Sequence, residues 1–297
     1  MHILLTGAAG FIGSQVAKCL INEGDQISVI LKPTTDTSRI TNILSFIRVF
    51  YGDISDIRLR KEVFSTIHPD VLIHLAWYVN PVDYLTSIKN LDSLITTLAL
   101  FKDAIEYSWP KIVGIGTCFE YARSDKLQVE NNPKEPEFLY SSCKLSAYAL
   151  GKALTQNTKT KFVWARPFHM HGPNESALRI IPQVITALKN NIPIDLTKGE
   201  QLRDHLHVSD VASAIVHIAK QEITGAVNIC SGNPITLRHV LEEIGDVLGR
   251  KELLRFGVKP YRDNEVIHLV GDNTILQRLG WKPKFTLRTG IENILSS

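Results

Sequence analysis

The sequence lacks the marks of several classes of protein. No apolar run approaches the ~18 residues that a membrane-spanning helix requires. The 33 basic and 30 acidic side chains nearly balance, so no excess of positive charge indicates a nucleic acid or an anionic membrane as partner. The first residues enter an apolar, strand-like pattern directly, without the basic and apolar regions of a secretion signal. Together these absences predict a cytoplasmic protein with no membrane or nucleic-acid partner.

Cysteine is scarce, and the few cysteines that occur are far apart. They are Cys19, Cys118, Cys143 and Cys230. No CxxC pair is present, and this spacing is typical of reduced thiols rather than of a disulfide framework or a zinc site. A group of histidines stands at His169, His171, His205 and His207. They have no acidic or cysteine partner at ligand spacing, so the sequence predicts no metal.

The chain contains instead a regular alternation of short apolar runs and longer amphipathic stretches. The runs are rich in Val and Ile and predict strands at His2–Leu5, Gln26–Leu31, Val49–Tyr51, Val71–Ala76, Ile112–Ile115 and Phe162–Ala165. Helical patterns lie between them, at Ile12 to Leu20, Leu91–Tyr107 and Ser141–Gln156. Parallel strands need crossover helices, so the alternation predicts an α/β fold with a doubly wound parallel sheet of the Rossmann type.

The regularity weakens after about Pro173. A loop is expected at 174–177, followed by helices at Leu178–Lys189, Val208–Ala219, Leu237–Leu248 and Leu287–Leu295, with one strand at Val227–Cys230. We therefore predict a dinucleotide-binding domain over residues 1–170 and a smaller α/β substrate domain, interleaved with it, over 171–297. Residues from about 205 to 231 are expected to fold back onto the first domain.

The strongest local motif is a glycine-rich turn between the first strand and the first helix. Gly7, Gly10 and Gly13 form a GxxGxxG pattern that includes Phe11 and Ile12. The first glycine permits a tight turn, the second lets a pyrophosphate approach the backbone, and the third permits close packing of helix on strand. A helix N-terminus offers free N–H groups and partial positive charge to the phosphates. The motif predicts a dinucleotide site.

The end of the second strand indicates which dinucleotide is bound. An acidic residue there accepts hydrogen bonds from a free ribose 2′-hydroxyl, whereas a basic residue pairs with a 2′-phosphate. The strand ends in Leu31-Lys32-Pro33, with Arg39 nearby. This favours NADP(H), with NAD(H) the alternative. Asp53, followed by Ile54 after the third strand, is a candidate acceptor for the adenine amino group.

A tyrosine and a lysine stand four residues apart at the start of a predicted helix. Tyr140 and Lys144 form a YxxxK motif, and this spacing places both side chains on one face. A neighbouring ammonium stabilises a phenolate, so we expect Lys144 to lower the pKa of Tyr140. Thr117 ends an apolar strand upstream, where its hydroxyl can donate to a carbonyl group. The glycine turn, the strand-end threonine and the YxxxK motif in this order predict a dinucleotide-dependent oxidoreductase.

With these motifs the chain resembles the extended short-chain dehydrogenases/reductases of the nucleotide-sugar epimerase/dehydratase group. The resemblance covers essentially the whole length and includes His74-Leu75-Ala76, Arg166 to Pro173 and Arg203 to Val211. It implies a homodimer and a catalytic set of Thr117, Tyr140 and Lys144. It further implies a cofactor contacted by Leu75, Ala76, Trp77, Tyr140, Lys144, Pro167 and His169. Substrate contacts are implied at Trp77, Cys118, Phe119, Glu120, Asn174 and Arg203, with Arg203 near a nucleotide diphosphate.

Departures from the family pattern bear on the reaction. Sugar-nucleotide 4,6-dehydratases carry an Asp-Glu pair directly after the catalytic Thr, whereas this chain has Cys118 and Phe119. Neither residue can supply or remove the protons of that reaction. Glu120, one position further on, is either a ligand of a substrate hydroxyl or a partly buried acid bonded to the backbone. Trp77 stands where related epimerases usually have a small residue, which indicates a narrowed sugar pocket.

The combination of Ala76-Trp77, the segment Gly116 to Tyr121 and the segment Arg166 to His169 is similar to that of nucleoside-diphosphate 4-keto-6-deoxyhexose reductases. It predicts reduction of the C4 keto group of a nucleotide-linked 4-keto-6-deoxy sugar by NAD(P)H. One alternative is a 4-epimerase that retains NAD and oxidises, then reduces, the same carbon. A second is a non-catalytic dinucleotide-binding protein of the same fold, which would not need all of Thr117, Tyr140 and Lys144.

Overall fold

The computed structural model describes residues 1–263 and 265–297. The chain divides into two compact units, each described by itself below. The first comprises residues 1–120, 136–166 and 212–227, and the second comprises 121–135, 167–211 and 228–297. The second unit thus takes in the segment 121–135, which the sequence analysis places in the domain of residues 1–170.

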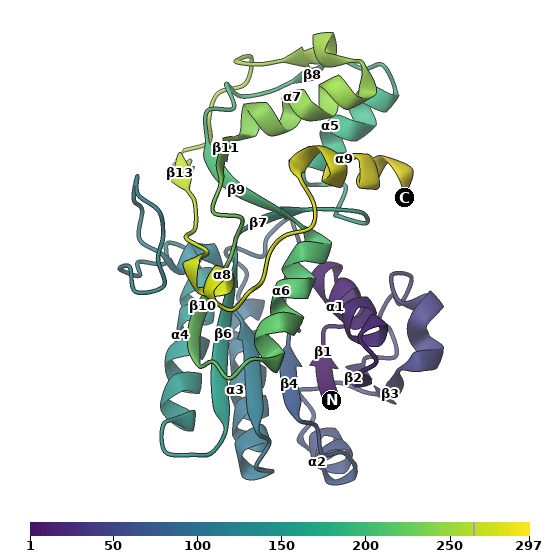
Figure 1. Cartoon of the computed structure of the whole chain (residues 1–297), viewed down its shortest axis with the longest axis vertical. Helices are drawn as coiled ribbons and strands as arrows, with labels where there is room; N and C mark the ends of the chain where they lie inside the picture. Colours follow the sequence, from purple (N-terminus) through teal and green to yellow (C-terminus); the bar gives the residue numbers. More distant parts are fainter. Residues whose placement is uncertain (264) are drawn as a thin grey trace. The chain divides into compact units, whose positions relative to one another are not determined.

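The first unit is built on a seven-stranded sheet in the order β10-β6-β5-β4-β1-β2-β3 (Figure 1). Its strands are β1 (His2–Thr6), β2 (Gln26–Leu31), β3 (Arg48–Tyr51), β4 (Val71–His74), β5 (Lys111–Ile115), β6 (Lys161–Pro167) and β10 (Gly225–Ile229). The pairings from β6 through to β3 are parallel. The predicted α/β fold with a doubly wound parallel sheet is therefore confirmed.

Helices connect these parallel strands. They are α1 (Phe11–Asn22), α2 (Ile57–Thr66), α3 (Lys89–Glu106) and α4 (Leu139–Thr155), and a further helix, α6 (Val208–Lys220), comes just before β10. The chain runs outward from β1 to β2 and β3, then returns to β4 on the other side of β1. Because crossover connections are right-handed, this reversal places α1 and α3 on opposite faces of the sheet. The carboxyl ends of β1 and β4 meet at this reversal, which is where sheets of this kind bind ligands.

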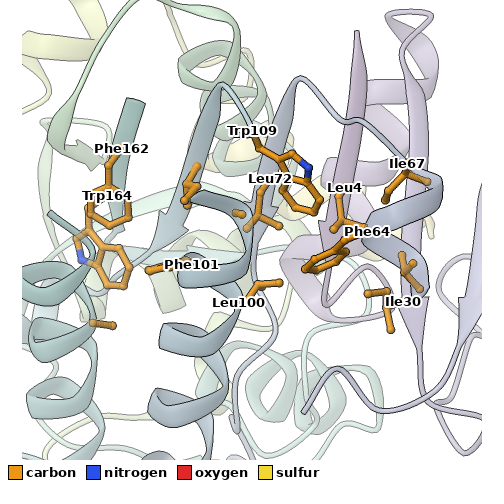
Figure 2. Close-up of a cluster of buried hydrophobic side chains, with 14 residues drawn as sticks. Leu4, Ile30, Phe64, Ile67, Leu72, Leu100, Phe101, Trp109, Phe162 and Trp164 are labelled. Atoms are coloured by element: carbon orange, nitrogen blue, oxygen red, sulfur yellow. The ribbon is translucent and has the colours of Figure 1, made fainter. Parts of the chain in front are cut away.

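The core on one face of the sheet is rich in aromatic side chains (Figure 2). Phe64 from α2 and Phe101 from α3 pack with Trp109, which precedes β5, and with Trp164 from β6. Trp109 and Phe64 have ring centroids 4.5 Å apart in an edge-to-face arrangement. Large buried rings contribute strongly to stability, so this cluster fixes the strands whose ends carry the site.

The second unit has its own small sheet. In it, β9 (Leu202–His207) pairs in parallel with β7 (His169–His171) and β13 (His268–Leu269), and antiparallel with β11 (Pro234–Thr236). A separate pair joins β8 (Ile194–Asp195) to β12 (Leu254–Arg255). The helices are α5 (Ile180–Lys189), α7 (Leu237–Leu248), α8 (Thr274–Arg278) and α9 (Leu287–Ser296). Apolar side chains of α5, α7 and α9 pack into one buried cluster.

A helix that crosses a lipid bilayer must be both long and apolar. Within residues 1–263 and 265–297, the helices are too short or too polar to do so.

Candidate active site

The glycine-rich turn joins β1 to α1 with little free space around it. Gly7 has φ of +72°, and a Cβ atom there would lie 2.7 Å from the backbone nitrogen of Ala76. A Cβ atom on Gly13 would lie 2.0 Å from the carbonyl oxygen of Gly7. Gly10 is the N-cap of α1 and supplies no side-chain cap, and the helix begins with Phe11 and Ile12. Only glycine fits at Gly7 and Gly13, as the motif predicts.

This turn has the chemistry of a dinucleotide-phosphate site. The N-terminus of α1 carries partial positive charge, and its first N–H groups receive no bond from a capping side chain. The absence of a side chain at Gly10 leaves the backbone open to a bulky anion. Leu75 and Ala76 follow β4 beside Gly7, in the position expected of residues that line the same ligand. The residues present therefore fit a nicotinamide dinucleotide.

Two of the predicted cofactor residues bind each other. Lys32 Nζ lies 2.8 Å from Asp53 Oδ2, and both side chains are largely exposed. Asp53 also accepts a hydrogen bond from the backbone N–H of Ser55. The charge of Lys32 is therefore already paired. A 2′-phosphate would have to compete with Asp53 for it. Ile54 packs against the aromatic core.

A buried histidine ties the ends of β1 and β4 together. His74 Nδ1 lies 2.7 Å from Thr6 Oγ1, and its Nε2 lies 2.8 Å from Thr97 Oγ1 on α3. Thr6 Oγ1 in turn accepts from the backbone N–H of Ala76. Burial lowers the pKa of His74 to about 3, so the ring is neutral and serves as a structural link. It holds the strand ends on which Gly7 and Ala76 lie.

The structure brings Thr117, Tyr140 and Lys144 together. Thr117 follows β5, and its hydroxyl lies near enough to the phenol of Tyr140, in the first turn of α4, to act on the pKa of that phenol. Lys144 lies one turn further along α4, and its Nζ donates to the carbonyl oxygen of Ile115 at 2.7 Å. Thr117 and Lys144 are almost fully buried. A reactive hydroxyl pair and an ammonium therefore meet at the carboxyl end of β5.

The electrostatics of this group differ from the sequence prediction. Loss of hydration raises the pKa of Tyr140 well above its ordinary value, and the nearby Thr117 hydroxyl offsets only part of this effect. Burial also lowers the pKa of Lys144 to about 7, although the charge of Glu120 opposes that shift. The expected lowering of the Tyr140 pKa by Lys144 is therefore wrong for this structure. Each group loses hydration on burial, and this loss dominates both pKa shifts.

Glu120 is placed differently from a substrate ligand. It has no exposed surface, and Oε1 accepts from the Thr117 backbone N–H and from Trp164 Nε1, each at 2.9 Å. Oε2 accepts from Arg166 Nε at 2.6 Å, and Arg166 is equally buried. The predicted contact with a substrate hydroxyl is corrected here, because protein donors already occupy both oxygens. Glu120 holds the backbone that carries Thr117.

The other predicted substrate residues near Thr117 are mostly covered by protein. Cys118 is buried, and the ring of Phe119 packs edge-on against Phe138, with centroids 6.2 Å apart. Trp77 is half-buried and lies against Lys144, whose Nζ is 3.9 Å from the centroid of the indole. Trp77 thus contacts the lysine of the YxxxK motif, an arrangement that the sequence analysis did not anticipate.

The remaining predicted residues belong to the second unit. Pro167 ends β6, His169 begins β7, and Asn174 has φ of +65° in the following turn. Arg203 on β9 is nearly buried and pairs with Glu265 at 3.2 Å. Loss of hydration lowers the pKa of His169 to about 3, so this side chain is neutral.

The four histidines form a row on two adjacent strands of that unit. His169 is opposite His205, and His171 is opposite His207, in the parallel register of β7 and β9. Over the part of the chain that the structure describes, no group of three or more histidine, cysteine, aspartate or glutamate side chains is arranged to hold a metal ion.

The structure adds residues that sequence reasoning did not place in the site. Asn90 on α3 is fully buried, and its Oδ1 accepts from Trp77 Nε1 at 2.8 Å. Tyr84 lies edge-on to Tyr140, with ring centroids 5.1 Å apart. Trp164 and Arg166 hold Glu120. A buried asparagine or arginine is unusual, but burial is visible only once the fold is known.

The parallel sheet, the glycine turn and the Thr117–Tyr140–Lys144 group are the features by which this chain resembles the short-chain dehydrogenases/reductases. The model of the NAD dependent epimerase/dehydratase family matches residues 3–230. This protein belongs to that family, which confirms the resemblance drawn from its motifs.

Relatives with named activities match almost the whole chain. A CDP-abequose synthase of Salmonella muenchen is 27% identical over 303 residues, which cover 99% of this chain and 97% of the relative. A dTDP-4-dehydro-6-deoxyglucose reductase of Escherichia coli is 25% identical over 310 residues, covering 99% and 96%. Among solved structures, the UDP-glucose 4-epimerase of Thermus thermophilus in complex with NAD has a TM-score of 0.87 and 21% identity, with full coverage of both chains. That last likeness concerns the fold.

Proposed function

We propose that this protein reduces the C4 keto group of a nucleotide-linked 4-keto-6-deoxy sugar. The observation that carries this proposal is the group of Thr117, Tyr140 and Lys144 at the carboxyl end of β5, in which Lys144 Nζ donates to the Ile115 carbonyl oxygen and lies 5.8 Å from the centroid of the Tyr140 ring. When bound, a reduced nicotinamide supplies the hydride. The Thr117 hydroxyl then donates to the sugar carbonyl oxygen, and Tyr140 gives its proton to the alkoxide that develops there. Positioned acid catalysis of this kind contributes roughly 10²–10⁴ in rate.

The protonated state of Tyr140 suits a reduction. Reduction consumes a proton, so its catalyst must hold one at neutral pH. A 4-epimerase must first remove a proton from the C4 hydroxyl, and the raised pKa of Tyr140 opposes that step. The similarity to a protein named dTDP-4-dehydro-6-deoxyglucose reductase supports reduction, and the similarity to one named UDP-glucose 4-epimerase, 26% identical over 324 residues, supports the epimerase alternative. The complete set of Thr117, Tyr140 and Lys144 favours an enzyme over a non-catalytic binding protein.

Dehydration is disfavoured by the residues after Thr117. Cys118 and Phe119 take the places of the dehydratase acid pair. Cys118 is buried, and Phe119 packs on Phe138. Glu120 is engaged with Arg166 and with the Thr117 N–H, so it does not replace the missing acids. The substrate we propose therefore arrives with its 6-deoxy carbon already made by another enzyme.

The cofactor is proposed to be NADP(H), with NAD(H) as the alternative. The glycine turn fits either dinucleotide, and Lys32 provides a cation where a 2′-phosphate would lie. Its pairing with Asp53 weakens this preference, since Asp53 competes for the same ammonium.

A homodimer and a cytoplasmic location complete the proposal. Helices α3 and α4 pack together, and both expose apolar side chains. They are Ile88, the N-cap of α3, Leu91 and Ile95 on α3, and Leu150 and Leu154 on α4. Exposed apolar side chains on two packed helices support pairing with a second copy. The four cysteines carry thiols rather than disulfides, which suits a reducing compartment. Sedimentation velocity at micromolar concentration distinguishes a dimer from a monomer.

The test is a substrate panel with both cofactors. The protein is mixed with NADPH or NADH and with 4-keto-6-deoxyhexoses linked to dTDP, CDP, GDP or UDP, while absorbance at the nicotinamide band is followed. Stoichiometric oxidation with one of these sugars supports the proposal. Interconversion of 4-epimers without net oxidation of cofactor, tested with UDP-glucose, would assign the epimerase instead.

A further inference from the structure

Lys144 is held in place from two sides within the first unit. Its Nζ donates to the Ile115 carbonyl oxygen at 2.7 Å and lies 3.9 Å from the centroid of the Trp77 ring. A cation within ~6 Å of an aromatic face is attracted by the ring, and tryptophan gives the strongest attraction. The ring of Tyr140 is further from Nζ, at 5.8 Å. Trp77 is therefore the principal aromatic partner of Lys144.

Trp77 is itself fixed by a buried amide. Its Nε1 donates to Asn90 Oδ1 at 2.8 Å, and Asn90 Nδ2 donates to the carbonyl oxygens of Tyr84 and Ser87. Asn90 has no exposed surface. The three hydrogen bonds fix the orientation of the Asn90 amide, and this amide in turn fixes the indole of Trp77. The face of Trp77 is thus held over Lys144 before any ligand binds.

The protonation state of Lys144 is set by the charges and the burial around it, so a contact that favours the ammonium affects that state. Burial lowers the pKa of Lys144 to about 7, so the charged and neutral forms are nearly balanced at neutral pH. Glu120 is the anion that favours the ammonium, and it is itself paired with Arg166. His74, which lies close enough to feel the charge of Lys144, is neutral. Tyr140 is protonated, and Cys118 near it is a buried thiol.

We propose that Trp77 is a positioning residue that acts through Lys144, holding the ammonium against Ile115 and favouring its charged form. This inference rests on the proposed function, because Lys144 matters to the reaction as the partner of Tyr140. It differs from the prediction that Trp77 stacks on the sugar. A stacking residue changes substrate affinity, whereas a positioning residue changes the titration of Lys144.

The experiment measures the titration of Lys144 directly. Protein labelled with ¹³C at the lysine ε-carbons is titrated by NMR, and the Lys144 signal is identified by its loss in Lys144→Met. In Trp77→Leu the pKa of Lys144 should fall by about half a unit or more, because the aromatic face that favours the ammonium is gone. Trp77→Phe keeps an aromatic face and should shift it less. It also provides the test if the leucine variant does not fold.

The control is the neighbouring aromatic residue. Tyr78 has a lysine of its own, Lys89, whose Nζ lies 4.9 Å from the ring centroid. Tyr78→Leu should leave the Lys144 titration unchanged. A Lys144 pKa that is unshifted or raised in both Trp77 variants, or an equal shift in Tyr78→Leu, would overturn the proposal.

Kinetics separate this proposal from the proposed function. Lys144 is charged below its pKa, so a lower pKa moves the alkaline limb of the kcat profile to lower pH in Trp77→Leu, with KM for the sugar nearly unchanged. A raised KM with an unmoved pH profile would assign Trp77 to sugar stacking and contradict the inference. If no 4-keto sugar is reduced at all, the proposed function fails, while the NMR titration still decides the role of Trp77.

Discussion

The buried pair of Glu120 and Arg166 yields the most specific prediction about stability. Neither side chain has exposed surface, and Arg166 Nε lies 2.6 Å from Glu120 Oε2. Removing one member of a buried ion pair leaves an uncompensated charge and costs about 3–5 kcal/mol. We therefore expect Glu120→Gln and Arg166→Met each to lower the free energy of unfolding by about that amount. The amide of the glutamine keeps an oxygen that can accept from the Thr117 N–H, so the loss reports on the charge.

The double variant decides whether the two effects share one cause. Glu120→Gln with Arg166→Met leaves no unpaired charge, so its loss should be smaller than the sum of the two single losses by about 1–3 kcal/mol. Urea unfolding followed by tryptophan fluorescence provides the measurement. Glu222→Gln is the control, because its pair with Lys161 is exposed and should be worth less than about 1 kcal/mol. Additive losses, or single losses as small as the control, would refute the reasoning.

Three further predictions concern the acid, the cofactor and pH. Tyr140→Phe should lower kcat at least a hundredfold while dinucleotide affinity stays within a few-fold, since the phenol acts only on the developing alkoxide. Retention of about a tenth of the wild-type kcat would contradict the role of Tyr140 as the acid. Lys32→Ala should reduce kcat/KM for NADPH more than for NADH. Asp53→Asn removes the anion paired with Lys32 and should raise the preference for NADPH. If the ratio of the two kcat/KM values is unchanged in both variants, neither residue takes part in cofactor choice. An unfolded histidine takes up a proton near pH 6.5, whereas burial lowers the pKa of His205 in the folded chain to about 3. The free energy of unfolding should therefore fall as pH is lowered from 6.5 towards 3, by up to about 1.4 kcal/mol per pH unit for such a histidine. Urea unfolding at several pH values should show that the free energy of unfolding depends less on pH in His205→Phe than in the wild type. His68 is exposed, and His68→Asn should show the same pH dependence as the wild type.

Much of the first unit could be predicted because its signals are local. Each predicted strand of the sheet is found within a few residues of its expected bounds, since buried parallel strands are continuous apolar runs. Helix α2 was not predicted, because its buried face carries the charged Arg60 beside Val63 and Phe64, which weakens the apolar pattern. Strand β9 was missed for a related reason: its buried residues include Arg203 and Asp204, which in sequence resemble a polar loop.

The candidate site shows where sequence reasoning ends. The spacing of Tyr140 and Lys144 placed both on one helix face, and the glycine turn and Thr117 upstream identified them as candidate catalytic residues. The direction of the Tyr140 pKa shift depends on its loss of hydration, which only the folded chain determines. Likewise, the partners of Glu120 come from β6, 44 and 46 residues away in sequence. Contacts over such distances are set by the sheet order and have no local signal.

The most direct test of the account is to follow the transferred hydrogen. Wild-type protein is incubated with NADPH deuterated at C4 of the nicotinamide and with the 4-keto-6-deoxy sugar nucleotide that it accepts, and the product is examined by NMR and mass spectrometry. The account predicts one deuterium at C4 of the sugar for each cofactor oxidised. Product without deuterium at C4, or turnover without net oxidation of NADPH, would contradict it.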